Sequence, residues 1–204
     1  RVHEIMAEEG IKLPVIAKIE KPQAVDNLES ITDAFDGIMV ARGDLGVELP
    51  LERVPLVQTE AIAIARRLAK PVIVATQVLE SMIENPRPVE TMARIIEATE
   101  DHALDRIEPL GVNPRTQGGA LTLAAADVAE FIGVKYICVF TESGDTVRRF
   151  SRLRKPIPII GFTPSRAIRR RMELTWGARS YEVPRVFSTD EMFEQVDKVL
   201  LDAG

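Results

Sequence analysis

Short apolar runs alternate along this chain with longer segments of helical periodicity. The first half contains three such runs, at 13–19, 37–41 and 71–78. Near-continuous apolar strands are typical of a parallel sheet covered on both faces, and a strand–helix–strand order produces right-handed βαβ units. We therefore predict an α/β fold in which one helix begins at Pro22 and another covers 56–68.

Proline and glycine residues interrupt this alternation at 106–119. Such residues end regular elements, so we place a domain boundary there and expect domains at 1–106 and 107–204. The alternation resumes in the second domain, with expected helices at 120–132, 145–153, 165–174 and 190–201 and expected strands at 136–141, 157–162 and 179–183. This order predicts a small doubly wound α/β domain.

The composition argues against a nucleic-acid-binding protein, a membrane protein and a disulfide-linked protein. With 26 basic and 31 acidic residues the net charge is −5, which argues against nucleic acid as the main partner. No apolar run approaches the ~20 residues of a membrane span, so we expect no membrane partner. The single cysteine, Cys138, excludes an internal disulfide framework and favours a cytoplasmic setting, and we expect it to be buried and inert.

Polar side chains stand where each of the three apolar runs of the first half ends. Lys18 and Glu20 are two residues apart and so point to the same face, Asp44 follows the second run, and Thr76 lies at the end of the third. In parallel α/β folds, reactive groups collect at the carboxyl ends of the strands. We therefore predict that these four side chains converge, with Gly43 allowing a ligand to approach the backbone closely.

Two carboxylates brought together need a counter-charge, because at ~4 Å they repel by roughly 4 kcal/mol at an effective dielectric constant near 20. Mg²⁺ or Mn²⁺ meets that need for Glu20 and Asp44 better than zinc does. Lys18 adds a point charge of the kind that binds phosphate. A metal ion, an ammonium group and a hydroxyl group together suit phosphoryl transfer or the stabilisation of an enolate.

Each of these features also has an ordinary structural interpretation. A Lys-x-Glu pair is often a solvated ion pair, an Arg-Gly-Asp sequence is often a turn, and a threonine at a strand end is often only a β-former. Their common position, directly after three successive strands, favours a site.

A second polar segment, Thr-Glu-Ser-Gly-Asp-Thr at 141–146, lies between an expected strand and an expected helix. Hydroxyl and backbone N–H groups at a helix N-terminus can bind an anion. The same residue types are ordinary helix caps and turn residues, and Glu142 and Asp145 count against phosphate. The spacing alone leaves both interpretations open.

Three segments together resemble pyruvate kinase of the bacterial type. They are Ile-Ala-Lys-Ile-Glu at 16–20, Gly-Ile-Met-Val-Ala-Arg-Gly-Asp-Leu-Gly at 37–46 and Val-Ala-Thr-Gln-Val-Leu-Glu-Ser-Met at 74–82. The resemblance continues through the second half of the chain. It implies part of a (β/α)8 TIM barrel followed by a small doubly wound α/β regulatory domain. It also implies a glycolytic enzyme that transfers phosphate from phosphoenolpyruvate to ADP, giving pyruvate and ATP.

The resemblance also implies a role for each residue that follows a strand. Lys18 would stabilise the phosphoryl group in transit, while Glu20 and Asp44 would hold Mg²⁺ or Mn²⁺. Gly43 and Asp44 would contact phosphoenolpyruvate, as would Lys18 and Thr76. Thr76 would also help to position the group that protonates the enolate.

Regulation and assembly are implied in the same way. The family's C-terminal domain holds the phosphate of an allosteric effector in a loop that Thr141, Ser143, Gly144 and Thr146 match. The resemblance further implies a homotetramer, and K⁺ bound through strands that are not among these residues.

The chain matches only part of the family's sequence. Its strands resemble the fifth, sixth and seventh of the barrel, so the N-terminal barrel half and the lid domain are missing, as are the family's last strands. After Asn-Pro-Arg-Pro at 85–88, the sequence continues directly with residues that resemble the helix after the family's eighth strand. A βα unit of roughly 30 residues, which contains that strand, is therefore omitted. Either the chain has an internal deletion or it comprises the ordered parts of a longer chain. We favour the second, because a deleted barrel strand leaves sheet edges open.

Two alternatives to a kinase remain open. A Mg²⁺-dependent lyase or aldolase acting on a pyruvate enolate would also place Glu and Asp at successive strand ends, but it would not need Lys18 or the segment 141–146. The chain could also be a non-catalytic regulatory module. Because strands that the family uses for further contacts are absent, we expect these 204 residues to be inactive on their own.

Overall fold

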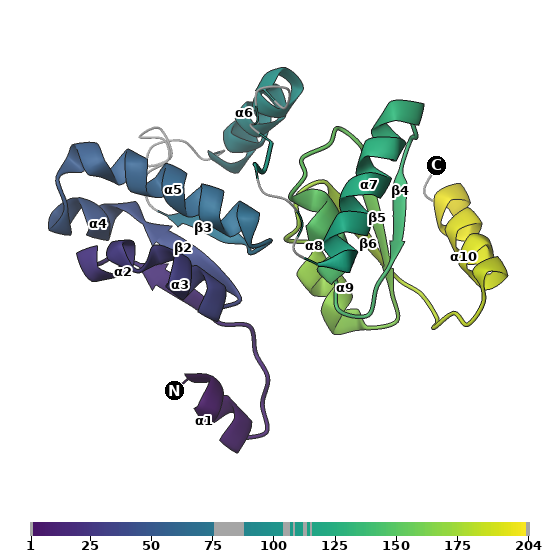
Figure 1. Ribbon diagram of the computed structural model, residues 1–204, viewed down its shortest axis with the longest axis horizontal. Coiled ribbons are helices and arrows are strands. Elements are labelled where there is room, and N and C mark those ends of the chain that lie inside the picture. Colours follow the sequence, from purple (N-terminus) through teal and green to yellow (C-terminus); the bar gives the residue numbers. More distant parts are fainter. Residues whose placement is uncertain are drawn as a thin grey trace. The chain divides into compact units, whose positions relative to one another are not determined.

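The computed structural model describes residues 2–75, 88–103, 107, 109–111, 114 and 116–202, which form two compact units at 1–92 and 93–204 (Figure 1). The predicted α/β class is confirmed, since each unit contains a three-stranded parallel sheet. Within the described part of the chain, no helix combines the length and the apolar character that crossing a bilayer requires.

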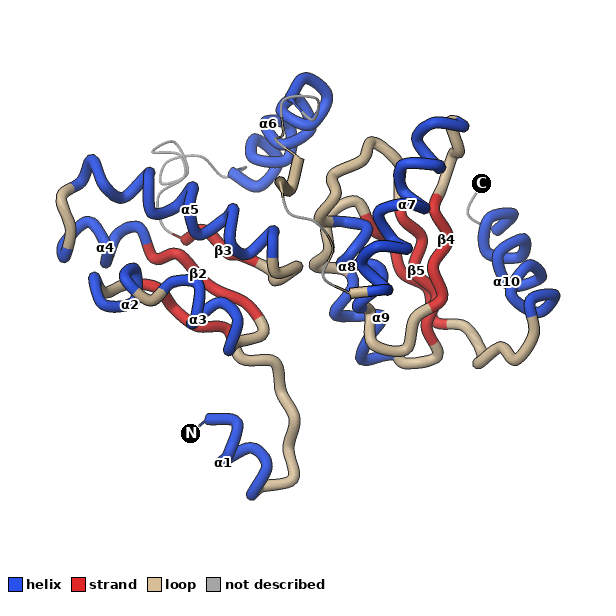
Figure 2. The backbone as a smooth tube through the Cα atoms, in the orientation of Figure 1, coloured by secondary structure: helices blue, strands red, loops and turns tan. Residues whose placement is uncertain are grey.

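The sheet of the first unit has the order β1-β2-β3, and Figure 2 shows β2 and β3 as neighbouring strands. Its strands are β1 (Ile16–Ile19), β2 (Gly37–Ala41) and β3 (Val72–Ala75). The helical segments around it are α1 (Val2–Glu8), α2 (Pro22–Asp26), α3 (Leu28–Ala34), α4 (Arg42–Glu48), the 3₁₀ helix η1 (Leu51–Arg53) and α5 (Val54–Arg67). A further helix, α6 (Pro88–Ala103), contains the division between the two units.

One face of this sheet is covered, and the other is exposed along its two edge strands. Ile19, Ile38 and Val40 are fully buried in a single core with apolar residues of α3 and α5. On the opposite face of the edge strands, Ile16 is 41% exposed and Ile73 is 40% exposed. The prediction of two covered faces is therefore wrong for this unit, because both helices pack on the same side as the right-handed crossovers require.

The segment expected to form one helix from Pro22 forms two, α2 and α3. The break is at Asn27, whose backbone lies outside the helical region at φ −115° and ψ 23°. Its side-chain amide donates to the carbonyl oxygen of Gln23 at 2.8 Å, which satisfies an acceptor at the end of α2. The break turns Leu28 and Thr32 into the core.

The second unit has the sheet order β4-β5-β6, with β4 (Ile137–Phe140), β5 (Ile159–Thr163) and β6 (Ala178–Glu182). Its helices are α7 (Gln117–Ile132), α8 (Asp145–Ser151), α9 (Arg166–Met172) and α10 (Thr189–Asp202). Apolar residues of α7, α8 and α9 cover one face of the sheet, and those of α10 cover the other. Every residue of the central strand β5 is consequently buried.

The expectation that Cys138 is buried is wrong, because its side chain is exposed. Its strand β4 is an edge strand of the described sheet. Ile137 and Val139 alternate with it and turn toward the core formed with α7 and α8, while Phe140 stacks on Phe162 at 4.8 Å between ring centroids. Cys138 points to the face where α10 covers Phe140.

Candidate functional site

Three charged side chains meet where β1 and β2 end. Lys18 is the third residue of β1, Glu20 follows the strand directly, and Asp44 lies in the first turn of α4, which begins where β2 ends. The parallel pairing of the two strands places their carboxyl ends at the same edge of the sheet. The ammonium nitrogen of Lys18 lies 2.7 Å from Oδ2 of Asp44 and also contacts Oε2 of Glu20. One cation therefore bridges the two carboxylates.

The position of Asp44 depends on how α4 is held. This helix has seven residues and one buried side chain, Leu45, which is fully enclosed in the core. At its other end Glu48 accepts a hydrogen bond from the ammonium group of Lys21, the residue after Glu20. The Arg-Gly-Asp tripeptide, for which a turn is the ordinary interpretation, is thus the first turn of a helix, held by the buried Leu45 and by the ion pair of Glu48.

The bridging contacts change the protonation equilibria of the site. Hydrogen bonds to Asp44 and then to Glu20 raise the pKa of Lys18, and the hydrogen bond from Lys18 lowers the pKa of Asp44. The side chains of Lys18, Glu20 and Asp44 are 51%, 37% and 57% exposed. The site is therefore charged, open to solvent and accessible to a ligand.

The donor set fits a hard divalent cation. Glu20 and Asp44 already share one positive group, which is also what two carboxylates that bind one metal ion do. No group of three or more His, Cys, Asp or Glu side chains suited to a metal occurs within the residues that the structure describes. Two carboxylates with the remaining positions left to water or substrate are typical of Mg²⁺ sites.

Gly43 and Thr76 are the two other residues predicted for this site. Gly43 is exposed and lies in the first turn of α4, next to Asp44. Thr76 lies outside the described residues. Sequence reasoning missed the contact between Lys21 and Glu48, which are 27 residues apart, because no local periodicity connects them.

The segment 141–146 connects β4 to α8 and includes the first two residues of that helix. The hydroxyl of Thr141 accepts from the N–H of Gly144 at 2.9 Å, and the hydroxyl of Ser143 accepts from the N–H of Asp145 at 3.3 Å. Gly144 adopts the left-handed φ of 77° that this turn requires. Thr146 is half-buried in the first turn of α8. The loop is therefore held in shape by its own hydroxyl groups.

The two acidic residues of this loop have cationic partners. Asp145 accepts from Arg149 at 2.5 Å, and Glu142 accepts from Arg185 at 2.6 Å. The first pair has the i, i+4 spacing of a helix and could have been predicted from the sequence. The second joins residues 43 positions apart, and no sequence signal indicated it.

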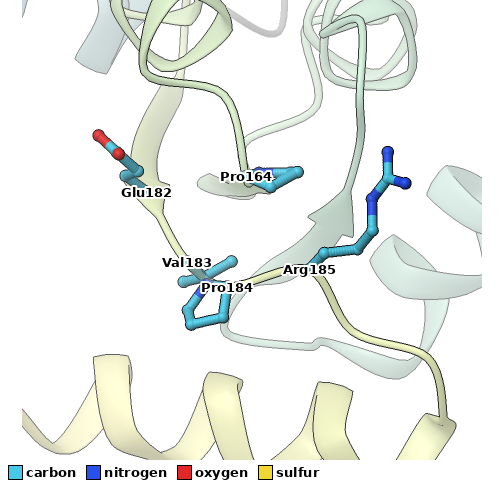
Figure 3. A pocket seen from close by; sticks show the side chains of 5 residues that line it. All are labelled: Pro164, Glu182, Val183, Pro184 and Arg185. Carbon is cyan, nitrogen blue, oxygen red and sulfur yellow. The ribbon is translucent and has the colours of Figure 1, made fainter.

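Arg185 also lines a shallow pocket beside the carboxyl ends of β5 and β6 (Figure 3). Its other lining residues are Pro164, Glu182, Val183 and Pro184. Because Arg185 pairs with Glu142, this pocket adjoins the loop 141–146. The second unit thus has a polar surface of its own.

Two family profiles match the chain. The barrel domain of pyruvate kinase matches residues 1–102, and the alpha/beta domain of pyruvate kinase matches residues 119–204. The solved structure of a pyruvate kinase from Cryptosporidium parvum is similar, with a TM-score of 0.88 and 26% identity over 99% of this chain and 50% of that one. The chain consists of part of a (β/α)8 barrel followed by an α/β domain.

Curated relatives are more similar in sequence. Pyruvate kinases from Mycobacterium intracellulare and Corynebacterium glutamicum are 48% and 46% identical over 100% and 98% of this chain, and 50% and 49% of their own lengths. The chain therefore spans about half the length of the relatives it matches. The alignment with the first extends over 237 positions against 204 residues here, a difference of 33, close to the roughly 30 residues of one βα unit. On these matches, the chain belongs to the pyruvate kinase family.

Proposed function

We propose that this chain supplies part of the active site of a pyruvate kinase, an enzyme that transfers the phosphoryl group of phosphoenolpyruvate to ADP and yields pyruvate and ATP. The observation that supports this most directly is the contact of one ammonium group, that of Lys18, with the carboxylates of Glu20 and Asp44 at adjacent strand ends. Phosphoryl transfer depends chiefly on positioning and on neutralising charge, which such a cluster provides.

The proposed roles follow the family resemblance. Glu20 and Asp44 hold Mg²⁺ or Mn²⁺, which when bound supplies positive charge next to the substrate. Lys18 offsets the negative charge that develops on the phosphoryl group as its bond to the enol oxygen breaks and its bond to the β-phosphate oxygen of ADP forms. Gly43 and Asp44 contact the substrate, and Thr76 helps to position the group that protonates the enolate carbon.

We propose the domain bounds, the cellular location, the oligomeric state and the monovalent cation from what is typical of the family. We assign the barrel part to residues 1–106 and the regulatory domain to 107–204, in a cytoplasmic homotetramer that also uses K⁺. Family membership supports this assignment. The two profile matches end and begin at 102 and 119, on either side of the assigned boundary.

The replacement Lys18→Met tests the proposed reaction. In the full-length enzyme it should lower ADP-dependent pyruvate release by several orders of magnitude while Mn²⁺ still binds, because the charge that faces the phosphoryl group is lost. Lys21→Met is the matched control, since Lys21 is the neighbouring lysine and pairs with Glu48 instead. Turnover near the wild-type rate in Lys18→Met would contradict the proposed role. Pyruvate release without ADP would favour a lyase or aldolase.

We also propose that the loop 141–146 binds the phosphate of an allosteric effector, through Thr141, Ser143, Gly144 and Thr146. The neutralisation of Glu142 by Arg185 and of Asp145 by Arg149 supports this, because it removes the main electrostatic objection to an anion. The preformed turn also leaves little ordering to be done on binding.

Titration calorimetry of the 204-residue chain with sugar phosphates and nucleoside monophosphates tests this second proposal. We expect heat of binding that is lost in Ser143→Ala combined with Thr146→Val, since both hydroxyl groups are then absent. Inorganic phosphate at the same ionic strength is the control for unspecific anion binding. If no phosphate compound binds, the loop is only a helix cap.

A further inference from the structure

The position of Lys18 bears on how a metal ion reaches the site. We propose that Lys18 is a built-in counter-ion, whose ammonium group stands in for the divalent cation between Glu20 and Asp44 and must leave at least one of them when the ion binds. This inference rests on the proposed function, which assigns the two carboxylates to the metal.

The contacts of Lys18 place it between the two acids rather than beside them. Its nitrogen is 2.7 Å from Oδ2 of Asp44 and contacts Oε2 of Glu20 as well. An ion held by these same two oxygen atoms would stand where this ammonium group stands. Two cations cannot share that place, because like charges at contact distance repel strongly. Metal binding through Oε2 of Glu20 and Oδ2 of Asp44 and the double contact of Lys18 are therefore mutually exclusive.

Lys18 also has room to move. Its side chain is 51% exposed and extends from β1, an edge strand of the described sheet, by four methylene groups. The carboxylates it leaves are themselves 37% and 57% exposed, so no buried charge is left without solvent. The lysine can thus change partners without any change in the fold.

This exchange gives Lys18 two successive states. Without the ion, the single positive charge of Lys18 offsets half of the negative charge of Glu20 and Asp44 and weakens their mutual repulsion. With the ion bound, the carboxylates are neutralised by it, and the ammonium group becomes available to an incoming phosphoryl group. The same lysine thus serves the empty site and the loaded site in different ways.

Lys21 offers a matched comparison. Its charge is adjacent in sequence, and the pKa of Lys21 is raised first by its hydrogen bond to Glu48 and to a smaller extent by the charges of Glu20 and Asp44. It therefore lies within electrostatic range of both acids, yet it contacts neither in the ion pairs that the structure shows. Removal of Lys21 measures the effect of one positive charge nearby without the effect of direct contact.

The test is Mn²⁺ binding to the 204-residue chain, followed by electron paramagnetic resonance of the free ion. We compare the wild type with Lys18→Met, Lys18→Arg and Lys21→Met, and use circular dichroism to show that each is folded. Lys18→Met should bind Mn²⁺ about tenfold more tightly, because the competing cation is gone. Lys18→Arg, which keeps the charge, should stay within about threefold of the wild type, as should Lys21→Met. The gain in Lys18→Met should shrink as salt rises from about 0.01 to 1 M.

The outcomes separate this inference from the proposed function. If the wild type binds Mn²⁺ through Glu20 and Asp44, so that Glu20→Gln abolishes binding, but Lys18→Met binds no more tightly, the counter-ion role is wrong and the metal site stands. Equal gains in Lys18→Met and Lys21→Met would show a general charge effect and would also overturn the inference. If neither the wild type nor Lys18→Met binds Mn²⁺, the metal site and the counter-ion role are both wrong.

Discussion

At the scale of single residues, the grouping of Lys18, Glu20 and Asp44 could be predicted because it needs only strand ends and a parallel sheet. Lys18 and Glu20 share a face by the two-residue period of a strand, and the pairing of β1 with β2 brings Asp44 to the same edge. The contact of Lys21 with Glu48 could not be predicted. It depends on where α4 ends in space, which no local pattern encodes.

The ion pair of Lys18 with Asp44 should make stability depend on pH at both extremes. The pKa of Asp44 is lowered in the folded chain, so its contribution is present above the ordinary value of 3.8 and is lost as pH falls through the lowered value. The pKa of Lys18 is raised, so its contribution is present below 10.5 and is lost only as pH rises through the higher folded value.

Asp44→Asn should therefore lower the free energy of unfolding by an amount that is constant between about pH 5 and 9 and vanishes in stronger acid. Urea denaturation at a series of pH values measures this difference. In a Lys18→Met background the same replacement should no longer destabilise the chain at neutral pH, because the partner is absent. A difference that persists unchanged into strong acid would contradict the assigned cause.

At the scale of elements, most strands and helices could be predicted from apolar periodicity. The strand at 37–41 has the expected bounds, and α5 begins two residues before the expected 56. The error at Asn27 arose because apolar spacing continues across the break while the backbone does not. A turn, the ordinary interpretation of Arg-Gly-Asp at 42–44, does not form there, although Gly43 and Asp44 are turn residues by type. The burial of Leu45 overrides that preference.

Close packing of helices on the second sheet gives a prediction at this scale. A Cβ atom at Gly161, in the middle of β5, would lie 3.1 Å from Sδ of Met172 and 3.1 Å from Cγ2 of Val147. Because α8 and α9 both press on this point, Gly161→Ala should lower the free energy of unfolding by about 1–3 kcal/mol. Trp176, the single tryptophan, lies in the same unit, so its fluorescence during urea denaturation follows this change.

Gly118→Ala is the control for this prediction. Gly118 lies in the first turn of α7, where the nearest atom to an added Cβ is Nη1 of Arg149 at 4.0 Å. Alanine fits there and favours a helix, so the stability should change by less than about 1 kcal/mol. If both replacements had the same effect, the contact with Met172 and Val147 would not be the cause.

At the scale of the whole molecule, the two units each have a core of their own. The core of the first contains Ile19, Ile38 and Val40, and the second has one cluster on each face of its sheet. The face of the first sheet that carries Ile16, Lys18 and Ile73 is open. In a closed barrel this inner face is filled by side chains from the other strands. The open face is thus what part of a barrel is expected to show.

By itself, the sequence determined the α/β class, most element positions and the family, because these depend on local periodicity and on the order of residues along the chain. The tertiary structure decided that Lys18 bridges Glu20 and Asp44, that Arg185 neutralises Glu142, and that one sheet face is open. Such outcomes depend on which distant segments pack together. The partners of a side chain are the residues that packing brings close to it in space. Separation along the chain does not indicate which residues these are.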